Sequence, residues 1–216
     1  MVPLLVDGKK IEAKNGANLL QACLDNNIYI PHLCYLDSLD IAPASCRLCF
    51  VEIEGEDKPT TSCTTTVKAH MAVKTDTPAI RRLQRTALRL LLSLHHVDCK
   101  NCHANKRCEL QNLAKFLKVG LKHKPLDRYL KEADIDVDHP LLNYYPNRCV
   151  LCGKCLHVCR SHHGQPVLTF ANRGFNTVMS FYASKDAPAS MCEDCTLCVD
   201  ICPVGALILK EAQHIS

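Results

Sequence analysis

The sequence lacks a long hydrophobic run, an export signal and a glycine-rich nucleotide motif. Its longest apolar stretch, residues 88–94, is interrupted by Arg89 and Ser93 and is far too short to span a bilayer. The first residues have no basic region and reach the turn residue Gly8 after a few apolar positions. Neither a G-x-G-x-x-G nor a Walker pattern occurs, so no nucleotide site is expected. These absences predict a cytoplasmic protein without a membrane span.

Cysteine is abundant instead, with 16 in 216 residues. Disulfide scaffolds are short and secreted, whereas cysteine clusters in a chain without an export signal indicate metal binding. The last eight cysteines repeat one pattern, C-x2-C-x2-C-x3-C, at residues 149–159 and 192–202. Bacterial two-cluster ferredoxins have this run, and the fourth cysteine of each run binds the other cluster.

The repeat therefore predicts two [4Fe–4S] clusters. Structural zinc is the alternative, but zinc needs four ligands, usually as two separated pairs, and would leave cysteines unused. Arg160 follows Cys159 where the ferredoxin run has proline, which affects the turn and not the number of ligands. One predicted cluster is bound by Cys149, Cys152, Cys155 and Cys202, and the other by Cys192, Cys195, Cys198 and Cys159.

A different spacing, with a close pair and two outlying cysteines, occurs near the N-terminus at Cys34, Cys46, Cys49 and Cys63. This set shares the close pair of plant-type [2Fe–2S] proteins but lacks their four-residue first gap. Zinc competes more strongly here, and the ferredoxin run elsewhere in the chain favours a [2Fe–2S] cluster. Cys23 belongs to no set and is predicted to be a core residue on the apolar face of a helix.

Three further cysteines need a fourth ligand: Cys99, Cys102 and Cys108. A histidine at the end of the preceding helix can supply it. His95, His96 and His103 are all candidates, and their spacing alone favours none of them. A neutral imidazole in place of a thiolate leaves a cluster one unit less negative, which favours its reduced state.

The expected fold class is α+β. Residues 1–77 are predicted to form a small β-rich domain of the β-grasp type, with a hairpin at Asp7-Gly8, a helix capped by Asn18, a strand at 50–54 and an edge strand at 71–74. Residues 78–120 are predicted to be helical, 121–146 to be a connector, and 147–216 to be the ferredoxin unit.

The helical segment begins at Thr77-Pro78, a cap followed by proline at the first helical position. Its arginines are expected to be solvated; they are Arg81, Arg82, Arg85 and Arg89. Its predicted apolar face consists of Ile80, Leu83, Ala87, Leu90, Leu91 and Leu94. A second helix is expected over 109–117.

These motifs, in this order, resemble an electron-input family. That family comprises the N-terminal part of the large iron–sulfur subunit of complex I, the N-terminal region of [FeFe] hydrogenases, and small iron–sulfur subunits of diaphorase-linked and electron-bifurcating hydrogenases. The resemblance covers essentially the whole chain and rests on residues 30–35, 46–49, 108–111 and 147–152. In that family the histidine lies four residues before the first cysteine of its set. The resemblance therefore implies His95 as the ligand that joins Cys99, Cys102 and Cys108 on a [4Fe–4S] cluster.

The resemblance implies an electron-transfer subunit with one [2Fe–2S] and three [4Fe–4S] clusters. We expect it to relay single electrons between a flavin/NAD(P)H-binding diaphorase subunit and hydrogenase subunits in a cytosolic hetero-oligomer. The chain stops at Ser216, so no catalytic domain is expected in it. Alternatives are the input subunit of a formate dehydrogenase or complex I-like enzyme, a free ferredoxin-like carrier, and a zinc module. Nucleic acid is not an expected partner, because no recognition motif accompanies the +4 charge and clusters would offset it.

Overall fold

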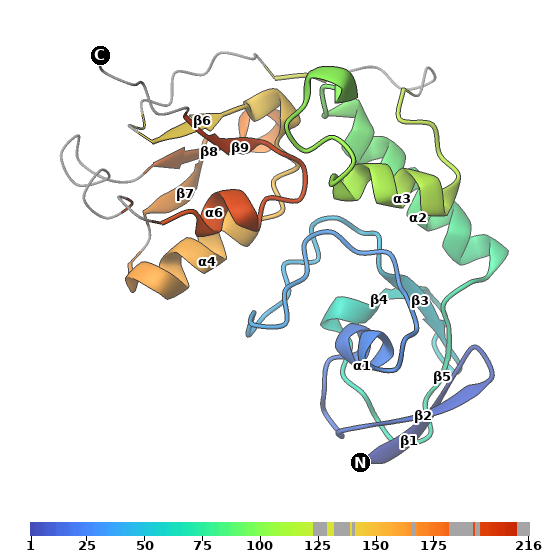
Figure 1. The fold of residues 1–216 in the computed structure, drawn as a ribbon. Helices are drawn as coiled ribbons and strands as arrows, with labels where there is room; N and C mark the ends of the chain where they lie inside the picture. Colours follow the sequence, from blue (N-terminus) through green and yellow to red (C-terminus); the bar gives the residue numbers. More distant parts are fainter. Residues whose placement is uncertain are drawn as a thin grey trace, which may run out of the picture. The chain divides into compact units, whose positions relative to one another are not determined.

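A computed structural model of the protein describes residues 1–122, 129–131, 139, 141–165, 167–181, 192 and 195–210. The chain divides into two compact units (Figure 1). The first comprises Met1–Leu91 and Leu113–Gly120, and the second comprises Leu92–Asn112 and Leu121–Ser216. Both helices and small sheets are present, so the protein is of mixed α and β structure. None of the described helices is long and apolar enough to cross a membrane.

The first unit contains a five-stranded sheet with the order β2-β1-β5-β3-β4. Its strands are β1 Val2–Val6, β2 Lys9–Ala13, β3 Phe50–Ile53, β4 Thr60–Thr61 and β5 Ala72–Lys74. β1 and β2 form the predicted hairpin, and both Asp7 and Gly8 have positive φ, at 49° and 81°. Two consecutive positive φ values match the twist of a two-residue hairpin, which explains the Asp-Gly pair at this position.

β5 is the central strand of this sheet, so the prediction of an edge strand at 71–74 was wrong. It pairs parallel with β1 and antiparallel with β3. Val73 is 2% exposed, as expected for a strand covered by neighbours on both sides. A three-residue strand has the same alternation at the edge and in the centre of a sheet, so the pattern alone could not decide its place.

Helix α1, Leu19–Asp25, covers the sheet and completes the core of the first unit. Asn18 caps it as predicted, because its side chain accepts a hydrogen bond of 3.2 Å from the backbone N–H of Gln21. Leu19, Leu20 and Cys23 are fully buried in the cluster that also contains sheet residues. The interpretation of Cys23 as a core residue is confirmed, and burial raises the pKa of its thiol to about 12.

Helix α2, Pro78–Ser93, begins at its predicted cap, where Thr77 Oγ1 accepts a hydrogen bond of 3.2 Å from the Ile80 N–H. Its buried face differs from the predicted one, because Leu83 and Leu90 are 37% and 55% exposed. The fully or nearly buried positions are Ile80, Gln84, Ala87, Leu88 and Leu92. Both stripes have helical spacing, so only packing could select one of them.

The arginines of α2 are less uniformly solvated than predicted. Arg81 forms a two-pronged pair with Asp76, at 2.5 and 2.9 Å, and its guanidinium lies 4.5 Å from the Phe116 ring centroid. Arg85 donates a hydrogen bond of 2.9 Å to the carbonyl of Leu117, whereas Arg82 is exposed. Asp76 precedes the helix, and Phe116 and Leu117 lie more than thirty residues after these arginines, so the spacing within the helix does not show these partners.

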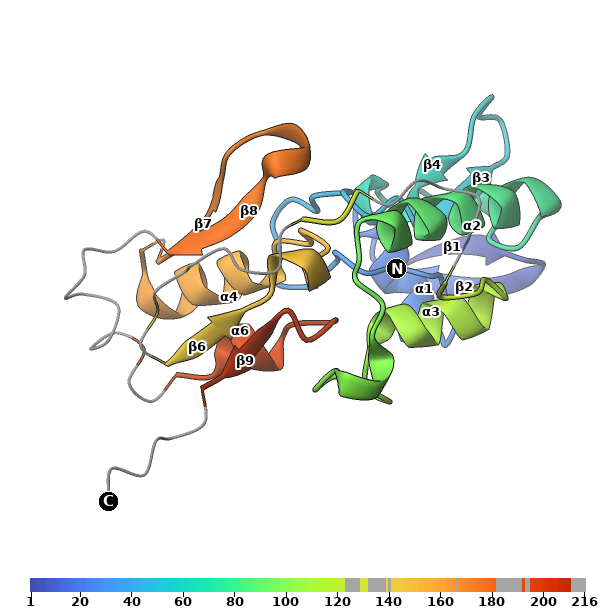
Figure 2. The same ribbon diagram turned by 90° about the horizontal axis from the view of Figure 1, so that it is seen from above.

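The second unit contains two small antiparallel sheets, β6–β9 and β7–β8. Its strands are β6 Leu142–Tyr144, β7 Leu168–Ala171, β8 Val178–Phe181 and β9 Leu207–Leu209. Its helices are α4 Lys154–His163 and α6 Leu197–Asp200. Helix α3, Glu109–Leu117, has the predicted bounds, and its residues from Leu113 onward belong to the first unit. Short 3-10 turns are η1 Ser62–Thr64, η2 Cys99–Asn101, η3 Pro146–Arg148 and η4 Gly174–Asn176. Helices α4 and α6 contact each other and lie side by side (Figures 1 and 2).

Candidate metal centres

The N-terminal cysteine set lies in the first unit, on loops beside β3 and in η1. Its thiols are buried, and the sulfurs of Cys34 and Cys46 are 3.4 Å apart. The hydrogen bond between Cys34 and Cys46 lowers the pKa of Cys34 to about 5, and the one between Cys49 and Cys63 lowers the pKa of Cys49 to about 7. Electrostatic interactions also connect Cys34 with Cys49 and Cys63. The fold thus gathers all four thiols of this set in one place.

Two local features hold this arrangement. Arg47 has a positive φ of 53°, which turns the chain sharply between Cys46 and Cys49. A non-glycine residue in this conformation is uncommon and often marks a functional site. The Asn18 side chain, besides capping α1, donates a hydrogen bond of 2.6 Å to the Cys63 carbonyl. The helix start and the last cysteine of the set are therefore joined directly.

The His95 side chain lies in the second unit just after α2. Its Nδ1 is 2.8 Å from the carbonyl oxygen of Arg148, so Nδ1 carries the proton and donates it to that oxygen. Burial lowers the pKa of His95, which favours the neutral imidazole. Nε2 is then an acceptor with a free lone pair, the arrangement found in histidines that bind metals. His103, in contrast, is exposed.

The three cysteines that follow His95 lie in and after η2. Burial raises the pKa of Cys108, and the charges of Cys102 and Cys99 raise it further, so the three thiols lie near one another. The chain just after Cys108 contacts the segment after Cys202, because the Glu109 N–H donates a hydrogen bond of 2.9 Å to the Pro203 carbonyl. A Cβ on Gly205 would lie 2.8 Å from Ala104 Cβ, which is closer than real contacts allow.

The first ferredoxin set lines a small, mostly apolar pocket. Its four cysteines line the pocket together: Cys149, Cys152, Cys155 and Cys202. Burial raises the pKa of Cys152 to about 12 and also raises that of Cys155, where the charges of the other three thiolates add to the effect. Leu151 and Gly153 have positive φ, at 52° and 77°, so the chain turns around the pocket between the thiols.

The second ferredoxin set also comes together. Burial raises the pKa of Cys198 to about 12, and the charges of Cys159, Cys192 and Cys195 raise it further. α4 carries Cys155 of one set and Cys159 of the other, one helical turn apart. The two ferredoxin sets therefore share a helix and lie next to each other, as the electrostatic interaction of Cys155 with Cys198 also indicates.

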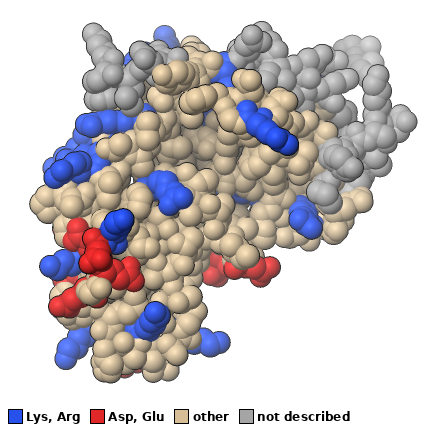
Figure 3. All heavy atoms as spheres, turned by 180° about the vertical axis from the view of Figure 1, so that it is seen from behind, with Lys and Arg blue, Asp and Glu red and all other residues tan. Residues whose placement is uncertain are grey.

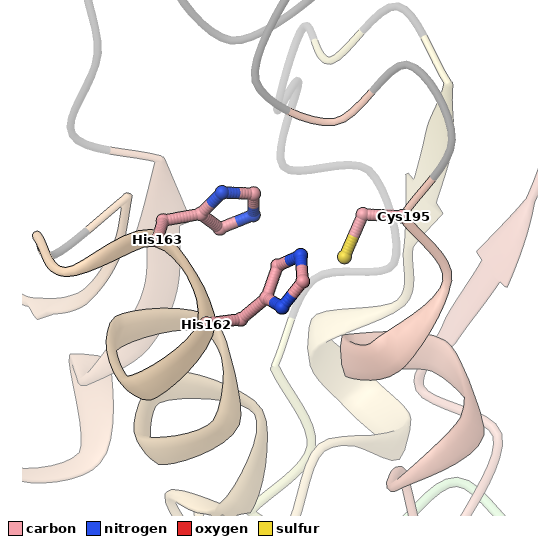
Figure 4. A group of neighbouring side chains, drawn as sticks. All are labelled: His162, His163 and Cys195. Atoms are coloured by element: carbon pink, nitrogen blue, oxygen red, sulfur yellow. The ribbon is translucent and has the colours of Figure 1, made fainter.

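Two histidines beside the second ferredoxin set were not predicted. Figure 4 shows His162 and His163, at the end of α4, on the same side as the Cys195 thiol. The nearest ligand atoms of the three residues lie within 4.8 Å of one another, a spacing that could hold a metal ion. The His-His doublet three residues after Cys159 was the signal in the sequence. Cys195 is also one of the four cysteines predicted to bind the second ferredoxin cluster, so the two imidazoles lie beside that predicted set.

These donor sets fit iron–sulfur clusters. The N-terminal set and the two ferredoxin sets each gather four thiols, the third set gathers three, and thiolates are the ligands that such clusters prefer. All sixteen cysteines are free thiols. Three family models match the chain: a 2Fe-2S iron-sulfur cluster binding domain over residues 1–78, the NADH-ubiquinone oxidoreductase-G iron-sulfur binding region over 84–123, and the ferredoxin-like domain of NADH-quinone oxidoreductase subunit 3 over 139–208.

Curated relatives match the chain over almost its whole length. It is 34% identical to the NADP-reducing hydrogenase subunit HndD of Solidesulfovibrio fructosivorans over 98% of this chain and 36% of that protein. It is 37% identical to the NADPH-Fe(3+) oxidoreductase subunit alpha of Geobacter sulfurreducens, over 97% of this chain and 24% of that protein. It is 34% identical to the NADH-ubiquinone oxidoreductase 75 kDa subunit of Reclinomonas americana, over 97% of this chain and 30% of that protein. The chain thus spans about a quarter to a third of these relatives.

A solved structure matches more completely. The fold is similar to a chain in the crystal structure of an NAD+-reducing [NiFe]-hydrogenase in the H2-reduced state, with a TM-score of 0.84 and 28% identity. The match covers 100% of this chain and 90% of that one. The protein belongs to the family of iron–sulfur electron-transfer proteins that includes the cluster-binding regions of the complex I 75 kDa subunit and of these hydrogenase subunits.

Proposed function

We propose that the protein is the electron-transfer subunit of a hetero-oligomeric oxidoreductase and relays single electrons between a flavin/NAD(P)H-binding subunit and a hydrogenase module. The observation that carries this proposal is the grouping of fifteen cysteine thiols into four sets in one small chain, together with a buried His95 imidazole whose Nδ1 is bonded to the Arg148 carbonyl. The printed names of an NADP-reducing and an NAD+-reducing hydrogenase among its relatives support this class of partner.

The proposed cofactors are one [2Fe–2S] and three [4Fe–4S] clusters. The five-stranded sheet with parallel β1 and β5 at its middle, covered by α1, supports a β-grasp fold for residues 1–77. The matched regions, 84–123 and 139–208, overlap the proposed domains at 78–120 and 147–216, and the second match begins inside the connector proposed at 121–146. The proposed ligands are Cys34, Cys46, Cys49 and Cys63 for the [2Fe–2S] cluster, then His95, Cys99, Cys102 and Cys108, then Cys149, Cys152, Cys155 and Cys202, and finally Cys192, Cys195, Cys198 and Cys159 for the [4Fe–4S] clusters.

The protein's own residues bind, shield and tune these groups, and the bound clusters supply one-electron chemistry. Thiolates hold the metal, and the Arg148 carbonyl orients the His95 ring so that Nε2 is the ligand atom. Apolar side chains around the first ferredoxin set keep water away from it. Because a neutral imidazole replaces a thiolate in the His95 set, that cluster is less negative and easier to reduce than an all-thiolate equivalent, other things being equal.

The distribution of charged side chains on the surface favours a protein partner over nucleic acid. On the face in Figure 3, lysine and arginine side chains lie in several separate places, and acidic side chains lie beside some of them. A nucleic-acid interface is expected to gather basic side chains on one face or along one element. The cytoplasmic location, inferred from cysteine usage, stays a prediction.

Anaerobic purification of the full chain tests the proposal. We expect about 14 iron atoms per chain, two from a [2Fe–2S] cluster and four from each cubane, with electron paramagnetic resonance (EPR) signals of both cluster types after reduction. Fewer than about ten iron atoms, or a colourless protein with stoichiometric zinc, would contradict it.

The partners distinguish the remaining candidates. Co-purification of flavin-containing and hydrogenase subunits is the expected result. A complex I-like or formate dehydrogenase partner would indicate the input subunit of such an enzyme, a class that the likeness to a complex I 75 kDa subunit favours. A stable monomer that passes electrons between separate enzymes would indicate a free ferredoxin-like carrier instead.

A further inference from the structure

The pocket of the first ferredoxin set contains one polar side chain besides its cysteines. The other described residues that line it are aliphatic residues, a glycine, a proline, a methionine and a phenylalanine. The exception is Tyr144, at the end of β6, which is 7% exposed. Apart from the thiols, its hydroxyl is the only side-chain hydrogen-bond donor among the described lining residues.

The hydrogen bonds of the Tyr144 hydroxyl fix the direction of its proton. The Met179 N–H, in β8, donates to the Tyr144 oxygen at 3.1 Å. That bond uses a lone pair of the phenol and leaves its proton to be donated, and its partner is the sulfur of Cys149.

We propose that Tyr144 raises the reduction potential of the [4Fe–4S] cluster assigned to Cys149, Cys152, Cys155 and Cys202 by donating a hydrogen bond to Cys149 Sγ. The inference rests on the proposed function, since it requires a cluster at this site. Reduction adds one negative charge to the cluster and its thiolates, and hydrogen bonds to charged acceptors strengthen as that charge grows. The bond therefore stabilises the reduced state more than the oxidised state.

The apolar surroundings of the pocket strengthen the hydrogen bond from Tyr144. A hydrogen bond is electrostatically stronger in a low-dielectric interior than in water, and no other lining side chain competes for the sulfur. Other contributions do not involve the phenol: the Leu151 N–H also donates to Cys149 Sγ, the Ala206 N–H donates to Cys202 Sγ at 3.3 Å, and the Lys131 ammonium acts electrostatically on Cys149. Tyr144 does not bind the cluster itself; it affects the cluster only through its hydrogen bond to Cys149.

The test is an EPR-monitored redox titration of the cluster-loaded full chain carrying Tyr144→Phe. We expect the reduction equilibrium constant of one [4Fe–4S] cluster to fall about tenfold, which for one electron is about 59 mV. The other clusters serve as internal references, and the iron content is expected to equal that of the wild type. Tyr145→Phe is the matched control, because Tyr145 is half-buried, stacks on Arg148 and does not line the pocket.

A second variant separates hydrogen bonding from packing. Phenylalanine leaves the Met179 N–H without its acceptor, whereas 3-fluorotyrosine placed at residue 144 keeps the acceptor and donates more strongly. We expect this substitution to shift the same potential upward, opposite to the Phe variant. Fully loaded variants with unchanged potentials, or shifts in the same direction for both, would overturn the inference. A wild-type chain without clusters would instead overturn the proposed function on which the inference depends.

Discussion

At the residue scale, the third ligand set shows how one hydrogen bond distinguishes equivalent candidates. His95, His96 and His103 are equally acceptable by spacing, but the Arg148 carbonyl accepts the Nδ1 proton of His95 and leaves Nε2 free. The same Arg148 precedes Cys149, the first cysteine of the ferredoxin unit. The orientation of the ligand therefore depends on a residue more than fifty positions away, which no local pattern contains.

A set of histidine variants tests this assignment. We expect His95→Ala to lose about four iron atoms, because a cubane needs its fourth ligand. His95→Cys is expected to keep them and to lower the potential of that cluster, since a thiolate adds negative charge. The control, His103→Ala, changes an exposed side chain and should leave the iron content unchanged. Loss of iron in His103→Ala together with full iron in His95→Ala would contradict the assignment.

At the scale of elements, loops that carry cysteines are held by close backbone packing. Gly205 has a φ of +64°, and a side chain there would meet Ala104 at 2.8 Å. Gly120 provides a contrast, because it lacks a positive φ and has open space where a Cβ would be. The two glycines therefore differ in both strain and space, although the sequence gives no sign of it.

We expect Gly205→Ala to destabilise the loaded protein by about 1–3 kcal/mol, since left-handed backbone and a tight contact both add cost. Gly120→Ala should change stability by less than about 1 kcal/mol. Urea unfolding followed by circular dichroism measures both. Because Cys102 Sγ also lies 3.5 Å from the added Cβ, the Gly205 variant should release iron from the His95 set first. Equal stability of the two variants would show that the loop adjusts freely.

The two histidines at the end of α4 lie beside Cys195, so an imidazole could replace the Cys195 thiolate as a ligand. We expect the double variant His162→Ala/His163→Ala to keep all its iron, because four cysteines already complete the second ferredoxin set. The matched change is Cys195→Ala, which should lose about four iron atoms. If the histidine variant instead loses four iron atoms and Cys195→Ala keeps them, an imidazole and not the Cys195 thiolate is the ligand.

Helix faces and strand positions were the weakest predictions at this scale. The helices over 19–25, 78–93 and 109–117 follow from their caps and spacing. The exposed Leu83 and Leu90 and the central place of β5 do not, because each short pattern is compatible with two arrangements. Tyr144 was missed for a related reason: its role appears only when β6, β8 and Cys149 meet in three dimensions.

At the scale of the whole molecule, the two units rely on different sources of stability. The first unit has a continuous apolar core between α1 and its five-stranded sheet. The second unit has two-stranded sheets and contains three of the four donor sets. Isolated two-stranded sheets are marginally stable, and metal binding adds folding free energy where ligands are otherwise unconnected.

Removal of iron is therefore expected to affect the units unequally. Hydrogen exchange measured by mass spectrometry on the full chain, with and without clusters, should show much faster exchange at residues 92–112 and 141–181 in the cluster-free protein. Residues 2–25 and 72–74 should keep most of their protection, because their core consists of apolar side chains. Equal loss of protection in both units would indicate a single cooperative structure.

The sequence by itself determined the kind of chemistry, because cluster ligation requires particular residue types at short, regular spacings that survive in the linear order. The repeated cysteine runs, the close pair Cys46 and Cys49, and the caps Asn18 and Thr77 all have this local character. Only the tertiary structure decided which atoms meet across long separations: the Arg148 carbonyl with His95, the Tyr144 hydroxyl with Cys149, and two imidazoles with Cys195. Such contacts arise from packing, which depends on the whole chain at once.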